Sequence, residues 1–259
     1  MWGAITGDVI GSVREFKGPC PEGFTFHPET WFATDDSILT AAVAEAIMDG
    51  GSYADSLRRW GRRHPGGGYG LRFGEWLRSE APAPYGSFGN GSAMRVSPVA
   101  WAFDSLERVL AEAESTAAPT HDHPEGVKGA QAVAAAIFVA RTGGSRADVR
   151  AVFESRFDYN CSRTLEQIRV RHVMDETCRG TIPQAAICAL LSTDVEDAIR
   201  KAVSLGGDAD TLGCITGSIA EAMYGGVPRA LRELVAARLP DDLRAVADRF
   251  AAHYSLPVA

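Results

Sequence analysis

The chain has 259 residues, a formal net charge of −7 and a hydrophobic fraction of 46%, values typical of a globular protein with a sizeable core. Its basic residues are scattered apart from a short run at Arg58, Arg59, Arg62 and Arg63, which at helical spacing is interpreted as a solvated helix face. This run is too small for an extended nucleic-acid-binding patch, but a single modified nucleotide stays open as a substrate. No stretch approaches about 18 consecutive apolar residues and the N-terminus has no basic segment. We therefore expect no membrane span, no signal peptide and a cytoplasmic location.

Helical periodicity extends over most of the chain. Apolar residues recur on a 3.6-residue period in the segments 37–48, 127–140, 184–191, 195–205, 212–224, 228–238 and 241–254. Several of these segments begin with capping signals, such as Asp194, Pro228 and Pro240. The Gly/Pro-rich region 64–91 is interpreted as an irregular loop region. Because no run of alternating β-branched residues occurs, the predicted fold class is all-α, with a single domain covering residues 1–259.

The cysteine pattern indicates a reducing compartment. The chain has five cysteines, an odd number, with no C-x-x-C pair: Cys20, Cys161, Cys178, Cys188 and Cys214. Three of them lie in apolar helical segments. We expect reduced, mostly buried thiols.

Two acidic clusters precede apolar helical segments. Thr34-Asp35-Asp36-Ser37 leads into residues 38–48, and residues 206–211, which include Asp208 and Asp210, lead into residues 212–224. Each cluster places two carboxylates and a hydroxyl at the start of a helix. Helix capping explains either cluster alone, because Asp and Thr accept hydrogen bonds from the free N–H groups of a first turn.

A metal site explains the two clusters together. One cap needs one acceptor, whereas each cluster supplies three oxygen-bearing side chains within four residues. If the clusters meet in space, Asp35, Asp36, Asp208 and Asp210 repel one another unless cations neutralise them. Oxygen ligands of this kind suit Mg²⁺, Mn²⁺ or Ca²⁺. The residues therefore favour a dinuclear site for hard divalent metals.

A series of motifs in this chain resembles the ADP-ribosylglycohydrolase family. The motifs, in order along the chain, are Gly7-Asp8, Gly11-Ser12, Glu15, Thr34-Asp35-Asp36, residues 89–95, Thr120-His121 and residues 207–211. Each motif is weak alone, but together they cover most of the chain in the family's order. The resemblance implies a compact orthogonal helical domain with two bound Mg²⁺ ions, Mn²⁺ being an alternative.

The resemblance also implies a set of metal ligands. Those of the first half-site are Thr34, Asp35 and Asp36, and those of the second are Asp208, Asp210 and Thr211, with Asp210 shared between the ions. Glu15, between Arg14 and Lys17, would alone be interpreted as a solvated loop charge. The resemblance assigns it to a mobile loop that places a glutamate against the metals. Asp35 and Glu15 are both candidates for the carboxylate that activates water, and the sequence does not choose between them.

The ADP-ribose site is expected around a glycine-rich loop. Phe88, Gly89, Asn90, Gly91 and Ser92 precede the apolar stretch 93–101, where backbone N–H groups can face a phosphate. Most such segments are simple turns, and a lone aromatic such as Phe88 more often belongs to a core. The resemblance implies that this loop holds the diphosphate and that Phe88 packs on a sugar or base.

His121 is the second expected element of this site. Its pair with His123 is interpreted either as two surface histidines or as metal ligands. The resemblance instead implies that His121 contacts the ligand near the diphosphate, and it leaves His123 without a role.

The expected function is hydrolysis of the bond between the distal ribose and an acceptor. The metals would hold the vicinal hydroxyls of that ribose, and a carboxylate would complete the activation of water. The acceptor is a protein side chain, a nucleobase or a small conjugate. Two alternatives are a non-catalytic ADP-ribose-binding protein and a metal-dependent phosphoesterase. The oligomeric state stays open, with a monomer favoured because no exposed apolar heptad needs a partner.

Overall fold

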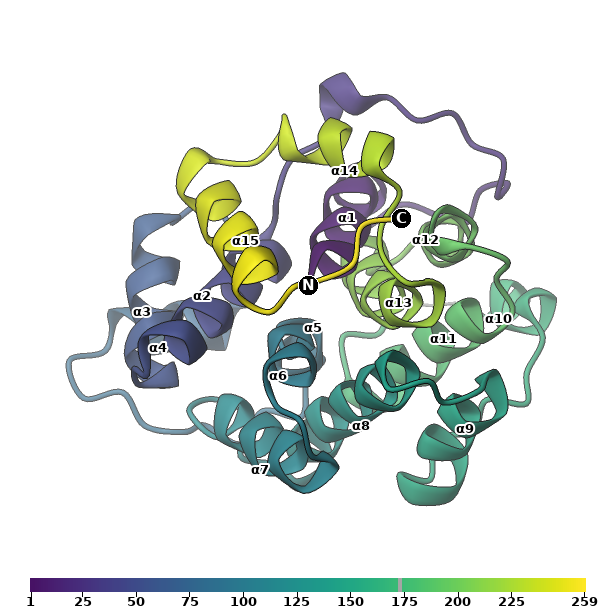
Figure 1. Ribbon diagram of the computed structural model, residues 1–259. Helices are drawn as coiled ribbons and strands as arrows, with labels where there is room; N and C mark the ends of the chain where they lie inside the picture. The colour runs from purple at the N-terminus through teal and green to yellow at the C-terminus, as the bar shows by residue number, and fades with distance from the viewer. Residues whose placement is uncertain (172–173) are drawn as a thin grey trace.

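A computed structural model describes residues 1–171 and 174–259, and these residues form helices joined by loops (Figure 1). Only isolated β-bridges accompany the helices there, so the all-α prediction is confirmed. The helices are α1 (Trp2–Gly11), α2 (Asp35–Asp49), α3 (Tyr53–Arg63), α4 (Leu71–Arg78), α5 (Gly91–Met94), α6 (Ser97–Ala102), α7 (Leu106–Ala117), α8 (Pro124–Arg141), α9 (Arg146–Ala151), α10 (Leu165–Arg171), α11 (Cys178–Leu190), α12 (Val195–Ser204), α13 (Ala209–Tyr224), α14 (Arg229–Ala236) and α15 (Asp241–His253). Short turns η1 (Ser12–Arg14), η2 (Pro28–Thr30) and η3 (Val152–Arg156) complete them.

The loop interpretation of residues 64–91 was wrong in one place. Residues 71–78 form α4, which buries Phe73, Trp76 and Leu77. These three side chains follow the i, i+3, i+4 spacing of a helix face. The helix is only eight residues long, and the surrounding glycines and prolines hide so short a pattern.

Helix α13 forms the centre of the fold. It is buried from Ala209 to Ala222, and it packs against α1, α8, α11 and α12 (Figure 1). Residues far apart in the sequence therefore converge on its N-terminal end.

Helices α1 and α13 cross with their backbones in contact. An added Cβ on Gly7 would lie 1.9 Å from the carbonyl oxygen of Gly213, and one on Gly217 would lie 2.2 Å from that of Gly3. Only glycine fits at such a crossing. This close approach brings the C-terminal half of α1 next to the first turn of α13.

Two features predicted from composition can be compared with the structure. All five cysteines are free thiols, and all but the half-buried Cys20 are buried. None of the helices in the described part of the chain is long and apolar enough to span a bilayer.

Candidate metal centre and binding cleft

The N-terminus of α2 carries the first acidic cluster. Thr34 is the N-cap, and its Oγ1 accepts a hydrogen bond from the backbone N–H of Asp36 at 3.3 Å. Thr34 thus serves as the helix cap, and the side chains of Asp35 and Asp36 are available for another role. The backbone N–H of Asp35 donates to the carbonyl of Gly67 at 2.6 Å, which fixes the start of α2 against the loop between α3 and α4.

The N-terminus of α13 carries the second cluster. Gly206 and Gly207 have positive φ angles of 74° and 65°, so the chain turns sharply before the helix begins. Asp208 occupies the N-cap position but makes no capping hydrogen bond. Its Oδ2 instead accepts from Asn90 Nδ2 at 2.5 Å. Thr211 Oγ1 donates to Asp36 Oδ2 at 3.2 Å and so joins the two clusters directly.

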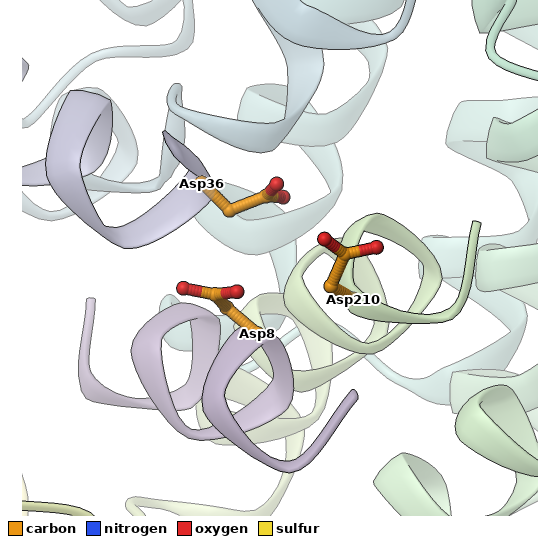
Figure 2. Close-up of side chains that lie close together, drawn as sticks. All are labelled: Asp8, Asp36 and Asp210. Carbon is orange, nitrogen blue, oxygen red and sulfur yellow. The ribbon is translucent and has the colours of Figure 1, made fainter. Parts of the chain in front are cut away.

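The carboxylates of Asp8, Asp36 and Asp210 face one another across the junction of α1, α2 and α13 (Figure 2). One oxygen from each lies within 4.8 Å of the others, and the same holds for Glu15, Asp208 and Asp210. Asp210 belongs to both groups. Asp36 Oδ1 and Asp210 Oδ1 are buried and have no hydrogen-bond partner within residues 1–171 and 174–259. Buried oxygens without a donor are costly, and a hard cation is the partner that fits these groups.

Burial raises the pKa of every aspartate in this cluster, and the charge of Asp210 adds to the rise for the others. The pKa of Asp8 rises to about 7 because it is buried and faces Asp210. Burial and the charge of Asp210 raise the pKa of Asp35, Asp36 and Asp208 well above the usual value. Burial also raises the pKa of Asp210. Cations among these groups would favour their ionised forms.

Asp8 is a site residue that the sequence interpretation quoted as a motif but did not assign. Its Oδ1 accepts from Thr34 Oγ1 at 2.7 Å, and its Oδ2 accepts from the N–H groups of Thr34 and Ser37, each at 3.1 Å. Ser37 Oγ donates to the same oxygen. Asp8 therefore holds the cap of α2 against α1. A carboxylate inside a helix made of apolar and small residues was the signal that could have identified it.

Glu15 lies beside the acidic cluster. Burial and the charges of Asp210 and Asp8 raise its pKa to about 7. Its loop is tied to the second cluster, because the Phe16 N–H donates to Gly207 O and the Gly207 N–H donates to Lys17 O, both at 2.8 Å. One carboxylate oxygen of Glu15 lies within 4.8 Å of oxygens of Asp208 and Asp210, two of the predicted metal ligands.

A cleft of 530 Å³ opens beside the cluster. Glu15, Asp35, Asp208, Asp210 and Thr211 line one part of it. The remaining wall includes residues that the sequence analysis did not single out for the site: Phe16, Leu39, Gly68, Tyr69, Gly70, Leu71, Arg72, Phe73, Tyr85, Ser87, Met94, Arg95 and Glu176. The cluster is therefore open to a ligand of considerable size.

The glycine-rich loop forms a second part of the cleft wall. Gly89, Asn90 and Gly91 line it, and Asn90 Nδ2 links this loop to Asp208. Phe88 is 49% exposed and lies outside the lining residues. The Ser92 side chain is fully buried and donates to Gly126 O at 2.7 Å, beneath the loop.

The two histidines have different surroundings. His121 lines the cleft and is 5% exposed, and its Nδ1 lies 2.7 Å from Thr120 Oγ1. Burial, followed by the charges of Arg95 and Arg72, holds the pKa of His121 well below its usual value. His123 caps α8, and its Nδ1 accepts from the Glu125 N–H at 3.1 Å. His123 is therefore used as a helix cap.

The chain is similar to several known proteins. A family model described as ADP-ribosylglycohydrolase matches residues 1–257. The chain is 27% identical to ADP-ribosylhydrolase ARH3 of Danio rerio, over 74% of this chain and 70% of that protein. It is 26% identical to ADP-ribosylarginine hydrolase Tri1 of Serratia proteamaculans, over 86% of this chain and 70% of that protein. A solved chain titled ADP-ribosylglycohydrolase-related protein complex has the same fold, with a TM-score of 0.74 and 23% identity, over 97% of this chain and 95% of that one.

Proposed function

Since the chain belongs to the ADP-ribosylglycohydrolase family, we propose that it is a hydrolase that releases ADP-ribose by cleaving the bond at the anomeric carbon of the distal ribose. One observation carries this proposal. The buried carboxylates converge at a cleft whose wall also contains the glycine-rich loop and His121. Such a cleft can hold a ribose by its hydroxyls and a diphosphate by N–H donors in the same molecule.

The proposed metal ligands are the two Thr/Asp clusters. They are Thr34, Asp35, Asp36, Asp208, Asp210 and Thr211. The unpartnered oxygens of Asp36 and Asp210 support two hard cations here, with Mg²⁺ preferred and Mn²⁺ as an alternative. Such cations supply positive charge and Lewis acidity and orient oxygen ligands. Asp8 positions Thr34 among these ligands.

Carboxylates of the chain itself would accept and donate the protons in this reaction. Water attacks the anomeric carbon, its proton passes to a carboxylate, and the acceptor leaves with the bonding electrons and takes up a proton. Glu15, with a pKa near 7, can both accept and return a proton at neutral pH. Asp35 lines the same part of the cleft and is the second candidate.

The diphosphate would lie against the glycine-rich loop. The N–H of Gly89 already donates to Ser87 Oγ, and that of Asn90 donates to Glu176 O. This leaves the N–H groups of Gly91 and Ser92 as the donors for a phosphate. Ser92 would thus act through its backbone, and Phe88 would contact the ligand from the rim.

The test is release of free ADP-ribose from arginine-, serine- and DNA-linked substrates, with Mg²⁺ and with EDTA. The relatives named above make protein side chains the acceptors to test first. Asp35→Ala and Asp210→Ala should abolish metal-dependent release. Asp241→Ala, at the exposed start of α15, is the matched control.

Three other results would replace the proposal. Release that persists in EDTA would contradict metal dependence. Binding of ADP-ribose without cleavage of any substrate would identify a binding protein. Release of phosphate with the glycosidic bond intact would identify a phosphoesterase.

A further inference from the structure

Arg95 lies buried beside the cleft with an unusual set of partners. Its side chain is 0% exposed, and its Nη2 donates to Thr116 O and to Thr120 Oγ1, both at 2.9 Å. Its Nε and Nη1 are buried without a hydrogen-bond partner among the described residues. A buried guanidinium held by neutral oxygens keeps its positive field, which acts on the groups nearest to it.

Thr120 connects this guanidinium to His121. A threonine hydroxyl has one hydrogen and two lone pairs, and Arg95, which can only donate, occupies one lone pair. Nδ1 of His121 lies 2.7 Å from the same hydroxyl oxygen. A bare Nδ1 would accept the hydrogen of Thr120, whereas a protonated Nδ1 would donate to the second lone pair of Thr120.

The positive charges favour the arrangement with a bare Nδ1. The ring is neutral, because burial and the charges of Arg95 and Arg72 hold its pKa well below the usual value. In a neutral ring one nitrogen carries the hydrogen and the other a lone pair. The side of the ring that faces Thr120 and Arg95 lies in the positive field, which stabilises the lone pair on Nδ1.

We infer that Arg95 and Thr120 are positioning residues that hold His121 as the neutral tautomer with its hydrogen on Nε2. The Nε2 atom lies against the glycine-rich loop, 3.6 Å from an added Cβ on Gly89 and 3.1 Å from one on Gly91. The imidazole therefore donates its N–H beside this loop. Under the proposed function, the acceptor is an anionic oxygen of the ADP-ribose diphosphate. The tautomer itself does not depend on that function.

The first test reads the tautomer directly. Long-range ¹H–¹⁵N correlation spectra of protein with ¹⁵N-labelled histidine distinguish a protonated ring nitrogen from a bare one, and His121→Gln identifies the signal by its loss. We expect a neutral ring at pH 7 with a protonated Nε2 and a bare Nδ1. A ring protonated on Nδ1 alone, or on both nitrogens, would overturn the inference.

The second test uses Thr120→Val, which keeps the shape of the side chain but removes its hydroxyl. The variant should show a mixture of tautomers and bind ADP-ribose, in the presence of Mg²⁺, on the order of tenfold more weakly. Thr120→Ser should restore both properties. Thr142→Val at the exposed end of α8, where Oγ1 donates to Phe138 O, is the matched control.

The two tests separate the inference from the function on which its ligand rests. A folded Thr120→Val protein with an unchanged tautomer and unchanged affinity would overturn the positioning role. If the wild-type protein does not bind ADP-ribose, the proposed function fails, and the wild-type spectrum still decides the tautomer.

Discussion

Replacing Gly7 with alanine tests whether the α1–α13 contact sets the geometry of the candidate metal centre. The new Cβ would lie 1.9 Å from the oxygen and 2.2 Å from the carbon of the Gly213 carbonyl, and 2.7 Å from the Cys214 nitrogen. All three atoms belong to the backbone, so none can rotate away. The two helices must separate by about 1.5 Å before the closest contact reaches the ordinary range, which begins at 3.4 Å.

The cost of this separation can be placed against known overpacking effects. Added methylene groups in a close-packed core cost about 1–3 kcal/mol, and a clash between two buried backbones should reach the upper end of that range. For a chain of this size, a loss of about 3 kcal/mol lowers the melting temperature by about 6–12 °C. The same movement separates Asp8 on α1 from Asp210 on α13, so Mg²⁺ affinity should also fall.

Urea unfolding measures the stability, and calorimetric titration with Mg²⁺ measures the affinity. Gly23→Ala is the control, because an added Cβ there meets no atom of the described residues within 4 Å. If Gly7→Ala unfolds at the same urea concentration as Gly23→Ala and binds Mg²⁺ as tightly, the α1–α13 crossing does not set the separation of Asp8 and Asp210.

Three further predictions follow from the site. Asp8→Asn should lower the free energy of unfolding by about 1–3 kcal/mol and weaken Mg²⁺ binding. The reason is that an amide cannot accept the four hydrogen bonds that the carboxylate accepts from Thr34 and Ser37. Urea unfolding measures the loss, with the exposed Asp49→Asn as the control. In EDTA, the free energy of unfolding should fall as the pH rises from about 4 to about 7, because Asp8 and its neighbours keep protons in the folded state that they lose in the unfolded state. Mg²⁺ should flatten this pH dependence. A rise in stability over that range would contradict the pKa directions. Ser92→Ala should leave ADP-ribose affinity nearly unchanged, because the Ser92 hydroxyl donates to Gly126 O beneath the loop. Gly91→Ala should weaken the affinity, because its Cβ would lie 3.1 Å from His121 Nε2. Equal effects of the two variants would contradict the assignment of Ser92 to a backbone role.

Local pattern was sufficient to predict the main elements of the fold. The 3.6-residue period in residues 37–48 and 212–224 correctly predicted α2 and α13, because each buries its side chains along most of its length. The period failed for α4, which is too short to show it against its glycine-rich surroundings. The predicted caps at Asp194 and Pro240 coincide with the starts of α12 and α15.

Only part of the candidate site could be predicted from the sequence. Both acidic clusters lie at helix starts, as their composition predicted, but their meeting depends on a crossing of α1 and α13 over 200 residues apart in the chain. No local pattern encodes that crossing. Asp8 and the Arg95–Thr120–His121 chain became visible only through hydrogen bonds between distant elements.

The hydrogen bonds between the Glu15 loop and Gly207 have a thermodynamic consequence. The backbone of Gly207 donates to Lys17 and accepts from Phe16, one residue before Asp208. The Glu15 loop cannot lift away without freeing the peptide that positions Asp208. Whatever orders that loop must therefore tighten ion binding, and ion binding must order the loop to the same extent, since linkage is reciprocal. At the proposed metal site, cation occupancy and loop order are therefore coupled by one interaction free energy.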